Sequence, residues 1–219
     1  MKKIIILGGH GDGLVAAQII KDMQQSGLEV ELAGFLNDHL QLGDTIENIP
    51  VLGKTSEWSF LDVEKKYYFY PALHKIKQMP QRKILLINLG IPSERLFSPV
   101  HPTATVASSA QIEHGCLIAS HVTVQPGARI ASYSSIRAGA NIGHDAHIEG
   151  FCYVGPNATM TGKSILREGA HLGPNAVIVD GITLETYAIA GAGSVILKDT
   201  MPNSLYIGNP ARKIMELYN

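Results

Sequence analysis

The chain has 219 residues, of which 45% are hydrophobic and 17% are charged, and its formal net charge is −1. This length can bury the core of one large or two small domains, and a charge so close to neutral argues against nucleic acid as a partner. No run approaches 18 apolar residues, so we expect neither a membrane span nor a signal peptide, and we predict a cytoplasmic protein.

The first 36 residues predict a βαβ unit. Residues 2–7 and 30–36 have the composition of buried strands, and residues 14–25 predict a helix between them. The glycine-rich loop at residues 8–13 could bring backbone amides close to a phosphate group. It also fits a relaxed dinucleotide-binding pattern, but that match begins several residues after the strand should end, so NAD is a less favoured ligand.

The segment from 54 to 99 carries fewer signals. We predict a strand at 66–70, a helix at 81–89 and a last strand at 95–100 that passes directly into the next region. Its aromatic residues are typical of a core or an interface rather than of a sugar-binding platform.

The region from Val100 to Ile196 has a six-residue repeat. All 17 positions at this interval are apolar, and the residue four places after each is small in 15 of the 17 repeats. A period of six fits neither a helix, whose apolar face returns every 3.6 residues, nor an alternating strand. It predicts short strands and turns wound into a solenoid, with large and small side chains sharing a narrow interior.

This repeat resembles the hexapeptide-repeat acyltransferases, whose left-handed parallel β-helix has three hexads in each coil. The run from Gly191 to Ile196, followed by Gly208-Asn209-Pro210-Ala211, is similar to the last coil and terminal loop of acetyl- and succinyltransferases. The resemblance implies a left-handed β-helix acyltransferase domain with a C-terminal loop at residues 100–219. Before it we expect a Rossmann-like α/β domain at residues 1–99.

The N-terminal region resembles one branch of that family, the sugar-nucleotide acyltransferases. This branch includes bacillosamine- and perosamine-type N-acetyltransferases and sialic acid O-acetyltransferases. The motifs that carry the resemblance are the glycine-rich loop, Phe35-Leu36-Asn37-Asp38 and the phrase at residues 49–53. It implies that residues 1–99 bind a nucleotide-linked sugar. Two groups of residues would serve this role: Asn37 and Asp38 at the nucleotide, and Gly9, Gly11, Asp12 and Gly13 near the diphosphate and sugar.

Two departures from the family pattern leave the ligand open. Aligned without gaps, the family's loop histidine falls on Asp12, while His10 lies two residues earlier, so either residue could meet the sugar. Asn37 stands where relatives have an acid, and an amide offers both a donor and an acceptor. The base preference is therefore undecided.

His144 is the candidate catalytic base. Acyl transfer from a thioester needs a group that takes the acceptor's proton, and histidine suits this role because its pKa lies near 6.5. His144 occupies the third position of its hexad, in a turn, so its ring should point away from the interior. The family's catalytic histidine stands in a similar context. Asp145, Glu149 or a backbone carbonyl could orient the ring.

The resemblance also implies where acetyl-CoA would bind. Tyr153 stands where relatives have a second histidine near the thioester, although it could equally be an outward aromatic on the flank of the helix. The pantetheine arm would lie between neighbouring β-helices of a homotrimer, near Gly162, Gly191 and the loop at Asn209 and Pro210. We expect no metal, because no His/Asp/Glu cluster has ligand spacing.

The favoured hypothesis is an acetyl-CoA-dependent enzyme that acetylates the amine of a nucleotide-linked 4-amino sugar by direct attack on the thioester. One alternative moves the acceptor to a sugar hydroxyl. Another is a non-catalytic nucleotide-binding β-helix, suggested by Gly143, Asp12 and Tyr153, which depart from the family pattern. The sequence names neither the sugar, the base nor the acyl length.

Overall fold

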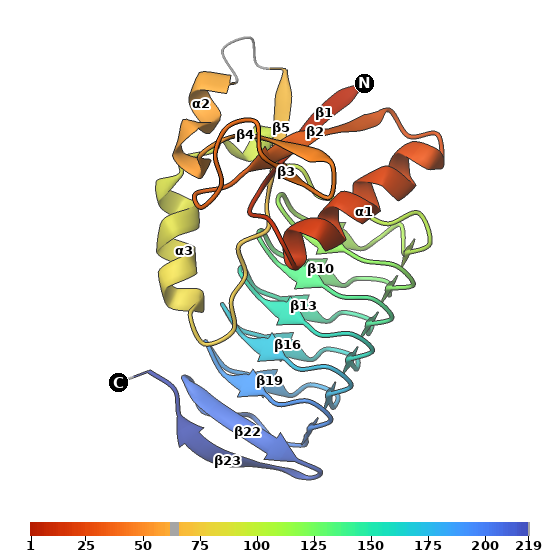
Figure 1. Cartoon of the computed structure of the whole chain (residues 1–219). Coiled ribbons are helices and arrows are strands. Elements are labelled where there is room, and N and C mark those ends of the chain that lie inside the picture. Colours follow the sequence, from red (N-terminus) through yellow and green to blue (C-terminus); the bar gives the residue numbers. More distant parts are fainter. Residues whose placement is uncertain (62–65, 219) are drawn as a thin grey trace.

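The computed structural model describes residues 1–61 and 66–218. An α/β region sits across one end of a long triangular prism of short strands, and the chain ends at the far end of the prism (Figure 1). None of the described helices has the length and apolar character needed to cross a membrane.

The N-terminal sheet, within the described residues, has the strand order β3-β4-β2-β1-β5. β1 is parallel to β2 and β5, and β4 is parallel to β2, while β3 and β4 form an antiparallel hairpin. The elements of this region are β1 Lys2–Leu7, α1 Asp12–Gln25, β2 Val30–Leu36, β3 Thr45–Ile46, β4 Ile49–Gly53, the 3-10 turn Thr55–Glu57, α2 Trp58–Leu61, β5 Tyr67–Pro71, α3 Met79–Asn88 and the 3-10 turn Ser93–Arg95.

The apolar composition of β1 is suited to the centre of this sheet. Its residues from Ile4 to Leu7 are fully buried, as expected for a parallel strand covered on both faces. The predicted strands at 2–7 and 30–36 are confirmed, and α1 begins two residues before the predicted helix.

The predicted strand at 95–100 is wrong. The chain there leaves a 3-10 turn and makes only single bridges, from Leu96 to Phe69 and from Val100 to Ile118. Pro99 has no backbone N–H to donate, which limits pairing in this segment. The chain therefore enters the β-helix as an extended connection rather than as a strand.

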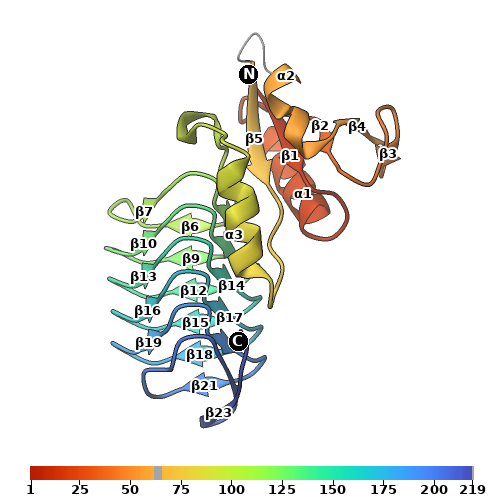
Figure 2. The same cartoon turned by 90° about the vertical axis from the view of Figure 1, so that its left-hand side faces the viewer.

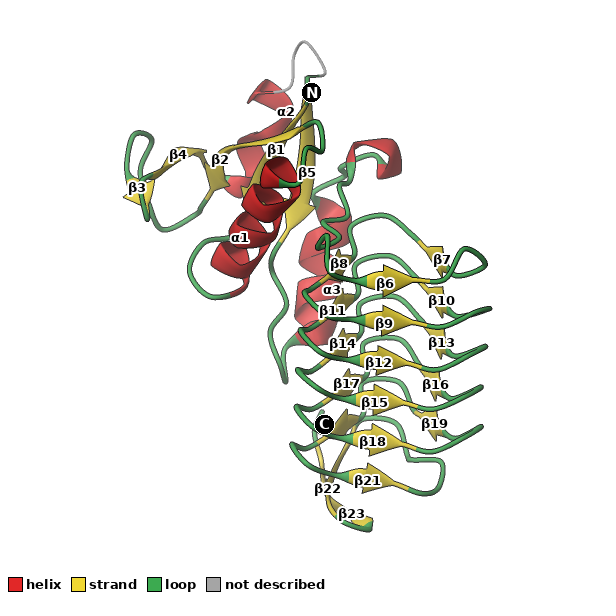
Figure 3. Ribbon diagram, turned by 90° about the vertical axis from the view of Figure 1, so that its right-hand side faces the viewer, coloured by secondary structure: helices red, strands yellow, loops and turns green. Residues whose placement is uncertain are grey.

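The β-helix follows the predicted repeat in register. From β6 to β18, all within the described residues, each strand pairs in parallel with the strand 18 residues later, as in Ile130 with Ile148. Three hexads therefore make one coil, and the coils stack into three sheets (Figure 3). The strands are β6 Thr105–Val106, β7 Gln111–Ile112, β8 Leu117–Ile118, β9 Thr123–Val124, β10 Arg129–Ile130, β11 Ser135–Ile136, β12 Asn141–Ile142, β13 His147–Ile148, β14 Tyr153–Val154, β15 Thr159–Met160, β16 Ile165–Leu166, β17 His171–Leu172, β18 Val177–Ile178, β19 Thr183–Leu184, β20 Ile189–Ala190 and β21 Val195–Ile196.

The interior is filled by the aliphatic and small positions of the repeat. Ile142 and Ile148 are fully buried, and Ala146 fills the narrow corner between them. The corner residues adopt left-handed backbone conformations, with φ of 57° at Asp145 and 74° at Gly127 on the preceding coil. Glycine and aspartate tolerate this conformation better than most residues.

The last coil is closed by a hairpin. β22 Ser204–Gly208 pairs in parallel with β20 and antiparallel with β23 Ala211–Glu216. Asn209 and Pro210 form its turn. The terminal loop that the sequence suggests is therefore a two-stranded extension of one sheet.

The α/β region is fixed to the β-helix by ion pairs. Asp12, at the start of α1, lies 2.9 Å from Arg137, and Asp22, near its end, lies 3.0 Å from His101. Lys83 of α3 lies 2.7 Å from Glu168, and Figure 2 shows α3 running beside the sheet that contains β14 and β17.

Candidate active site

His144 lies on the corner between β12 and β13, held by the coils on either side. The backbone N–H of Asp145 donates to the carbonyl of Pro126 on the preceding coil, at 3.0 Å. The carbonyl of His144 accepts from Lys163 on the following coil, at 2.9 Å. The repeat thus fixes the backbone of the corner while both side chains remain about half exposed, at 55% for His144 and 59% for Asp145.

Asp145 orients the histidine ring. Its Oδ2 lies 3.0 Å from Nδ1 of His144, and a carboxylate there favours the tautomer with hydrogen on Nδ1. Nε2 is then left as a proton acceptor. Glu149, the other acidic alternative, instead pairs with Arg167 at 2.7 Å and accepts the backbone N–H of Glu168.

Two glycines make room for this pair. A Cβ on Gly162 would overlap Nε2 of His144, and a Cβ on Gly127 would overlap the carboxylate of Asp145. The imidazole therefore lies over one coil and the carboxylate over the other. Gly162, which the sequence suggested as a cofactor contact, is the surface on which the ring rests.

A cavity of about 400 Å³ opens at the N-terminal glycine loop, a size suited to a small-molecule site. Of the sequence-predicted binding residues it brings together Gly9, Asn37 and Asp38. The full lining comprises Gly8, Gly9, His10, Asn37, Asp38, His39, Leu40, Thr55, Ala72, Leu73, His74 and Arg82.

Asn37 and Asp38 both make hydrogen bonds within the chain. The Asn37 amide donates to the carbonyl of Gly8 at 2.8 Å, and its oxygen accepts the backbone N–H groups of His39 and Leu40. The Asp38 carboxylate accepts the N–H and the hydroxyl of Thr55, each at 2.8 Å. These side chains shape the cavity, and contact with a nucleotide stays a prediction for both.

The other predicted loop residues lie outside this cavity. Gly11 has a φ of 73° immediately before α1. Gly13 is buried against Phe35. Asp12 turns toward Arg137 and lines a second cavity, whereas His10 lines the first.

The second cavity, of about 280 Å³, lies between the α/β region and the β14 sheet. Tyr153 stacks there on His171 with ring centroids 4.4 Å apart, and the Arg137 guanidinium lies 5.8 Å from the tyrosine ring. Burial lowers the pKa of His171 to about 4, helped by the nearby His74.

His74 borders both cavities. Burial lowers the pKa of His74 to about 4, against the opposing effect of Asp12. No motif in the sequence points to His74 or His171 as a site residue. The 18-residue interval from Tyr153 to His171 is the sequence signal for their stacking, because one coil separates them.

Tyr153 and His144 lie on different parts of one chain. Tyr153 belongs to β14, beneath the α/β region, whereas His144 lies on the corner that leads into β13. Figures 2 and 3 show the β13 sheet on the side of the prism facing away from the α/β region. One chain therefore does not bring these two predicted site residues together.

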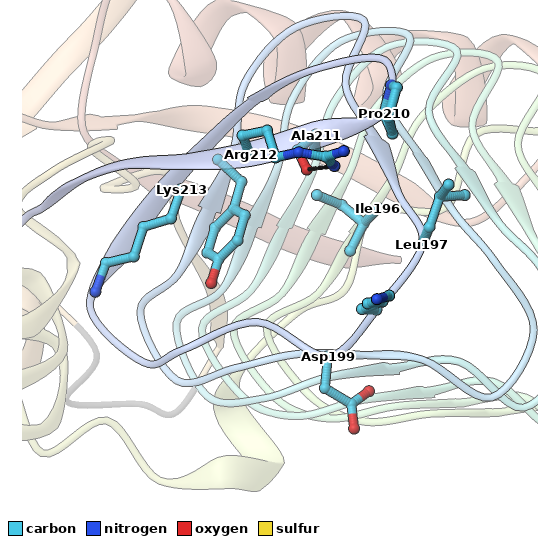
Figure 4. A pocket seen from close by; sticks show the side chains of 9 residues that line it. Ile196, Leu197, Asp199, Pro210, Ala211, Arg212 and Lys213 are labelled. Carbon is cyan, nitrogen blue, oxygen red and sulfur yellow. Dashed lines mark hydrogen bonds between the residues drawn. The ribbon is translucent and has the colours of Figure 1, made fainter.

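A third cavity, of about 430 Å³, lies at the C-terminal hairpin. Pro210 lines it, together with the cationic residues Lys198, Arg212 and Lys213. Figure 4 shows Arg212 and Lys213 on β23 and Asp199 on the chain after β21, around one hollow.

The other predicted cofactor contacts at this end lie outside the hollow. Asn209 is exposed at the tip of the hairpin. Gly191 packs close to Ile207 and donates its N–H to the carbonyl of Tyr206 at 2.8 Å. Within the described ranges, no group of three His, Cys, Asp or Glu residues could hold a metal ion.

No family model matches the chain. Among curated proteins, dTDP-3-amino-3,6-dideoxy-alpha-D-galactopyranose 3-N-acetyltransferase of Aneurinibacillus thermoaerophilus is 47% identical over 51 residues. These are 23% of this chain and 27% of that protein, so the match spans about a quarter of the curated relative.

Solved structures match nearly the whole chain. The acetyltransferase domain of PglB from Neisseria gonorrhoeae gives a TM-score of 0.86 at 25% identity, covering 98% of this chain and 100% of that one. Its complex with acetyl coenzyme A gives 0.83 at 26%, covering 97% and 99%. Perosamine N-acetyltransferase from Caulobacter crescentus, in complex with CoA and GDP-perosamine, gives 0.84 at 24%, covering 99% and 98%. These likenesses confirm the predicted fold, an α/β region followed by a left-handed β-helix.

Proposed function

We propose that this chain, which belongs to the hexapeptide-repeat sugar acyltransferases, transfers an acetyl group from acetyl-CoA to the amine of a nucleotide-linked 4-amino sugar. His144 is the general base. The observation that carries the proposal is the His144–Asp145 pair, which presents Nε2 at an exposed corner of the β-helix.

The reaction needs no covalent enzyme intermediate. The neutral amine attacks the thioester carbonyl, and a C–N bond forms as the carbonyl becomes a tetrahedral oxyanion. Nε2 of His144 takes the proton that the amine loses. The oxyanion then collapses, the C–S bond breaks, and the sulfur leaves as the thiolate of coenzyme A, which takes up a proton.

The two substrates have separate candidate sites. The cavity at the glycine loop would take the nucleotide-linked sugar, and GDP-perosamine is the ligand of a structural relative. The hollow at the C-terminal hairpin carries Lys198, Arg212 and Lys213, which could meet the phosphates of acetyl-CoA by charge-assisted hydrogen bonds. Acetyl coenzyme A itself is the ligand of another relative.

A second copy of the chain would complete the site. The His144 corner and the glycine-loop cavity belong to different sides of one chain, so the base of one copy would serve a sugar bound by its neighbour. Threefold symmetry closes such an arrangement into a homotrimer. Tyr153 would then approach the His144 of another copy rather than its own.

A product assay tests the activity. Purified protein with acetyl-CoA should convert one of the UDP-, GDP- or dTDP-linked 4-amino sugars to its N-acetyl form, detected by mass spectrometry. His144→Ala should lower turnover by about 10²–10⁴, the usual contribution of a general base, while His114→Ala, at an exposed histidine elsewhere in the repeat, should retain activity. Wild-type turnover by His144→Ala would refute the assignment, and acetylation of a matched hydroxy sugar alone would move the acceptor to oxygen.

Mixing variants tests the shared site. His144→Ala and a variant that breaks the glycine-loop cavity, Asp38→Ala, should each be inactive alone. Refolding them together should restore part of the activity, because some sites combine an intact base with an intact cavity. Absence of any recovery would place both functions within one chain.

A further inference from the structure

We propose that Arg82 of α3 binds the diphosphate of the nucleotide-linked sugar, in the cavity that Arg82 and the glycine loop line together. This inference rests on the proposed function for the ligand's identity. The residue itself lies outside every motif that suggested a site in the sequence, and its assignment comes from four features of the structure.

Arg82 lies on the inward face of its helix. Met79 and Leu86, three residues before it and four after it, are buried, whereas Ile84 and Ile87 on the opposite face are exposed. Residues with this spacing share one side of a helix. Arg82 is therefore a half-buried cation on the buried stripe of α3, where it lines the cavity.

The charge of Arg82 has no counterion among the residues that the structure describes. Among the described residues, no carboxylate lies within ion-pair distance of Arg82, whereas the adjacent Lys83 pairs with Glu168 at 2.7 Å. Asp38, the carboxylate that lines the same cavity, accepts the N–H and the hydroxyl of Thr55 instead. An anion that enters the cavity would supply the missing partner.

The glycine loop, which lines the same cavity, offers neutral donors for the anion. Within the described part of the chain, the backbone N–H groups of Gly9 and His10 donate to no protein acceptor, whereas Gly8 donates to Leu36. Backbone N–H groups in a glycine-rich loop are suitable donors for phosphate oxygens. A cation and unpaired backbone amides lining one cavity suit a group that has several charged oxygens.

The shape of the arginine head favours a phosphate group over an anion with a single charged oxygen. A guanidinium presents parallel N–H groups that meet two phosphate oxygens at once. A diphosphate bridging the cavity would contact Arg82 with one phosphate and the Gly9–His10 amides with the other. The sugar would then extend past His74 toward the second cavity, since His74 borders both.

Calorimetry with UDP, GDP and dTDP, each beside its monophosphate, tests the assignment. For the diphosphate that wild type binds, Arg82→Gln should weaken binding by about tenfold to a hundredfold, the range expected for a lost charged hydrogen bond. The matching monophosphate should lose much less. The diphosphate affinity of Arg82→Lys should lie between those of wild type and Arg82→Gln, because lysine keeps the positive charge but lacks the paired N–H donors of the guanidinium.

Lys77→Gln is the matched control. Lys77 is an exposed cation just before α3 that lines neither cavity, so its variant should bind as wild type does. Equal diphosphate binding by wild type and Arg82→Gln would overturn the role of Arg82 and leave the proposed function standing. Failure of wild type to bind any of the three diphosphates would instead refute the nucleotide-sugar proposal, and this inference with it. If Arg82→Gln does not fold by circular dichroism, Arg82→Lys decides by the same comparison.

Discussion

The β-helix and the α/β region hold their polar side chains in different ways. At the His144 corner the backbone bonds are the same coil-to-coil contacts that recur throughout the prism, and the side chains of His144 and Asp145 project from them. At the glycine-loop cavity the polar side chains themselves hold the structure, as Asn37 does by bonding to Gly8, Leu40 and His39.

Because of this difference, we expect the two sites to respond differently to substitutions. The backbone and the buried aliphatic ladder fix the position of a β-helix corner, so truncating an exposed side chain there should leave the fold intact. The cavity at the glycine loop lacks this support, because the side chains of Asn37 and Asp38 line the cavity and also make the hydrogen bonds that hold its wall. We therefore expect changes at the corner to alter catalysis alone, and changes at the cavity to alter stability and binding together.

The largest effect is expected from the ladder beneath the corner. Ile142 is fully buried directly before the His144 turn, and Ile142→Ala should lower the free energy of unfolding by about 2–5 kcal/mol. Ile84→Ala, at a side chain that is 61% exposed, should change it by less than about 0.5 kcal/mol. Urea denaturation measures both, and equal stabilities would show that the ladder is not what fixes the corner.

The next largest effect is expected at the glycine beneath the His144 ring. Gly162→Ala places a methyl group where Nε2 of His144 lies, so the ring must move. A displacement of this kind should lower kcat by about 100-fold, with little change in melting temperature or nucleotide affinity. Gly150→Ala, where a Cβ would meet a single backbone oxygen at 3.3 Å, should keep its activity. If Gly162→Ala lost nucleotide affinity instead, the separation between the two regions would fail.

The repeat explains why the β-helix could be predicted from the sequence. An aliphatic residue recurs at every sixth position and ends a short strand each time. The pattern from Val106 to Ile196 therefore predicts the position of every strand in this range. The position of His144 in its hexad likewise predicts an exposed ring. Its partner could not be chosen among Asp145, Glu149 and a carbonyl, because that choice depends on side-chain rotation and on Arg167, one coil away.

The α/β region was less predictable because its contacts join distant segments. Asp12 reads as a loop residue near the sugar, yet it pairs with Arg137, 125 residues later. Arg82 belongs to no motif, and only the folded structure places it in the cavity that the glycine loop also lines. The segment at 95–100 has strand-forming residues but finds single bridges rather than a strand.

The boundary between the two regions should respond to pH. The pKa of His171 is near 6.5 in an unfolded chain and about 4 in the folded protein, so between these values the unfolded chain binds more protons. Stability should therefore fall as pH falls, by about 2 kcal/mol for this imidazole from pH 7 to pH 5. His74, with the same lowered pKa, adds a second contribution of the same sign.

Urea midpoints at pH 7 and pH 5 measure this loss. His171→Phe keeps a flat ring against Tyr153 and removes one titrating group, so its stability should fall less over the same interval. His114→Phe, at an exposed histidine, should retain the wild-type dependence. A wild-type stability that is equal at the two pH values would contradict burial of the imidazoles at this boundary.

The smallest effect tests whether Asn37 shapes the cavity or reads the base. Asn37→Asp keeps the oxygen that accepts from His39 and Leu40 but replaces the donor to Gly8 by an oxygen. The loss of one hydrogen bond should lower the free energy of unfolding by about 1–2 kcal/mol and weaken the binding of UDP, GDP and dTDP by similar factors. Asn48→Asp, at an exposed asparagine, is the control and should change neither quantity. A change in affinity for only one of the three nucleotides would mean that the Asn37 amide contacts the base. Shaping the cavity and contacting the ligand would then be separable functions in the α/β region as well.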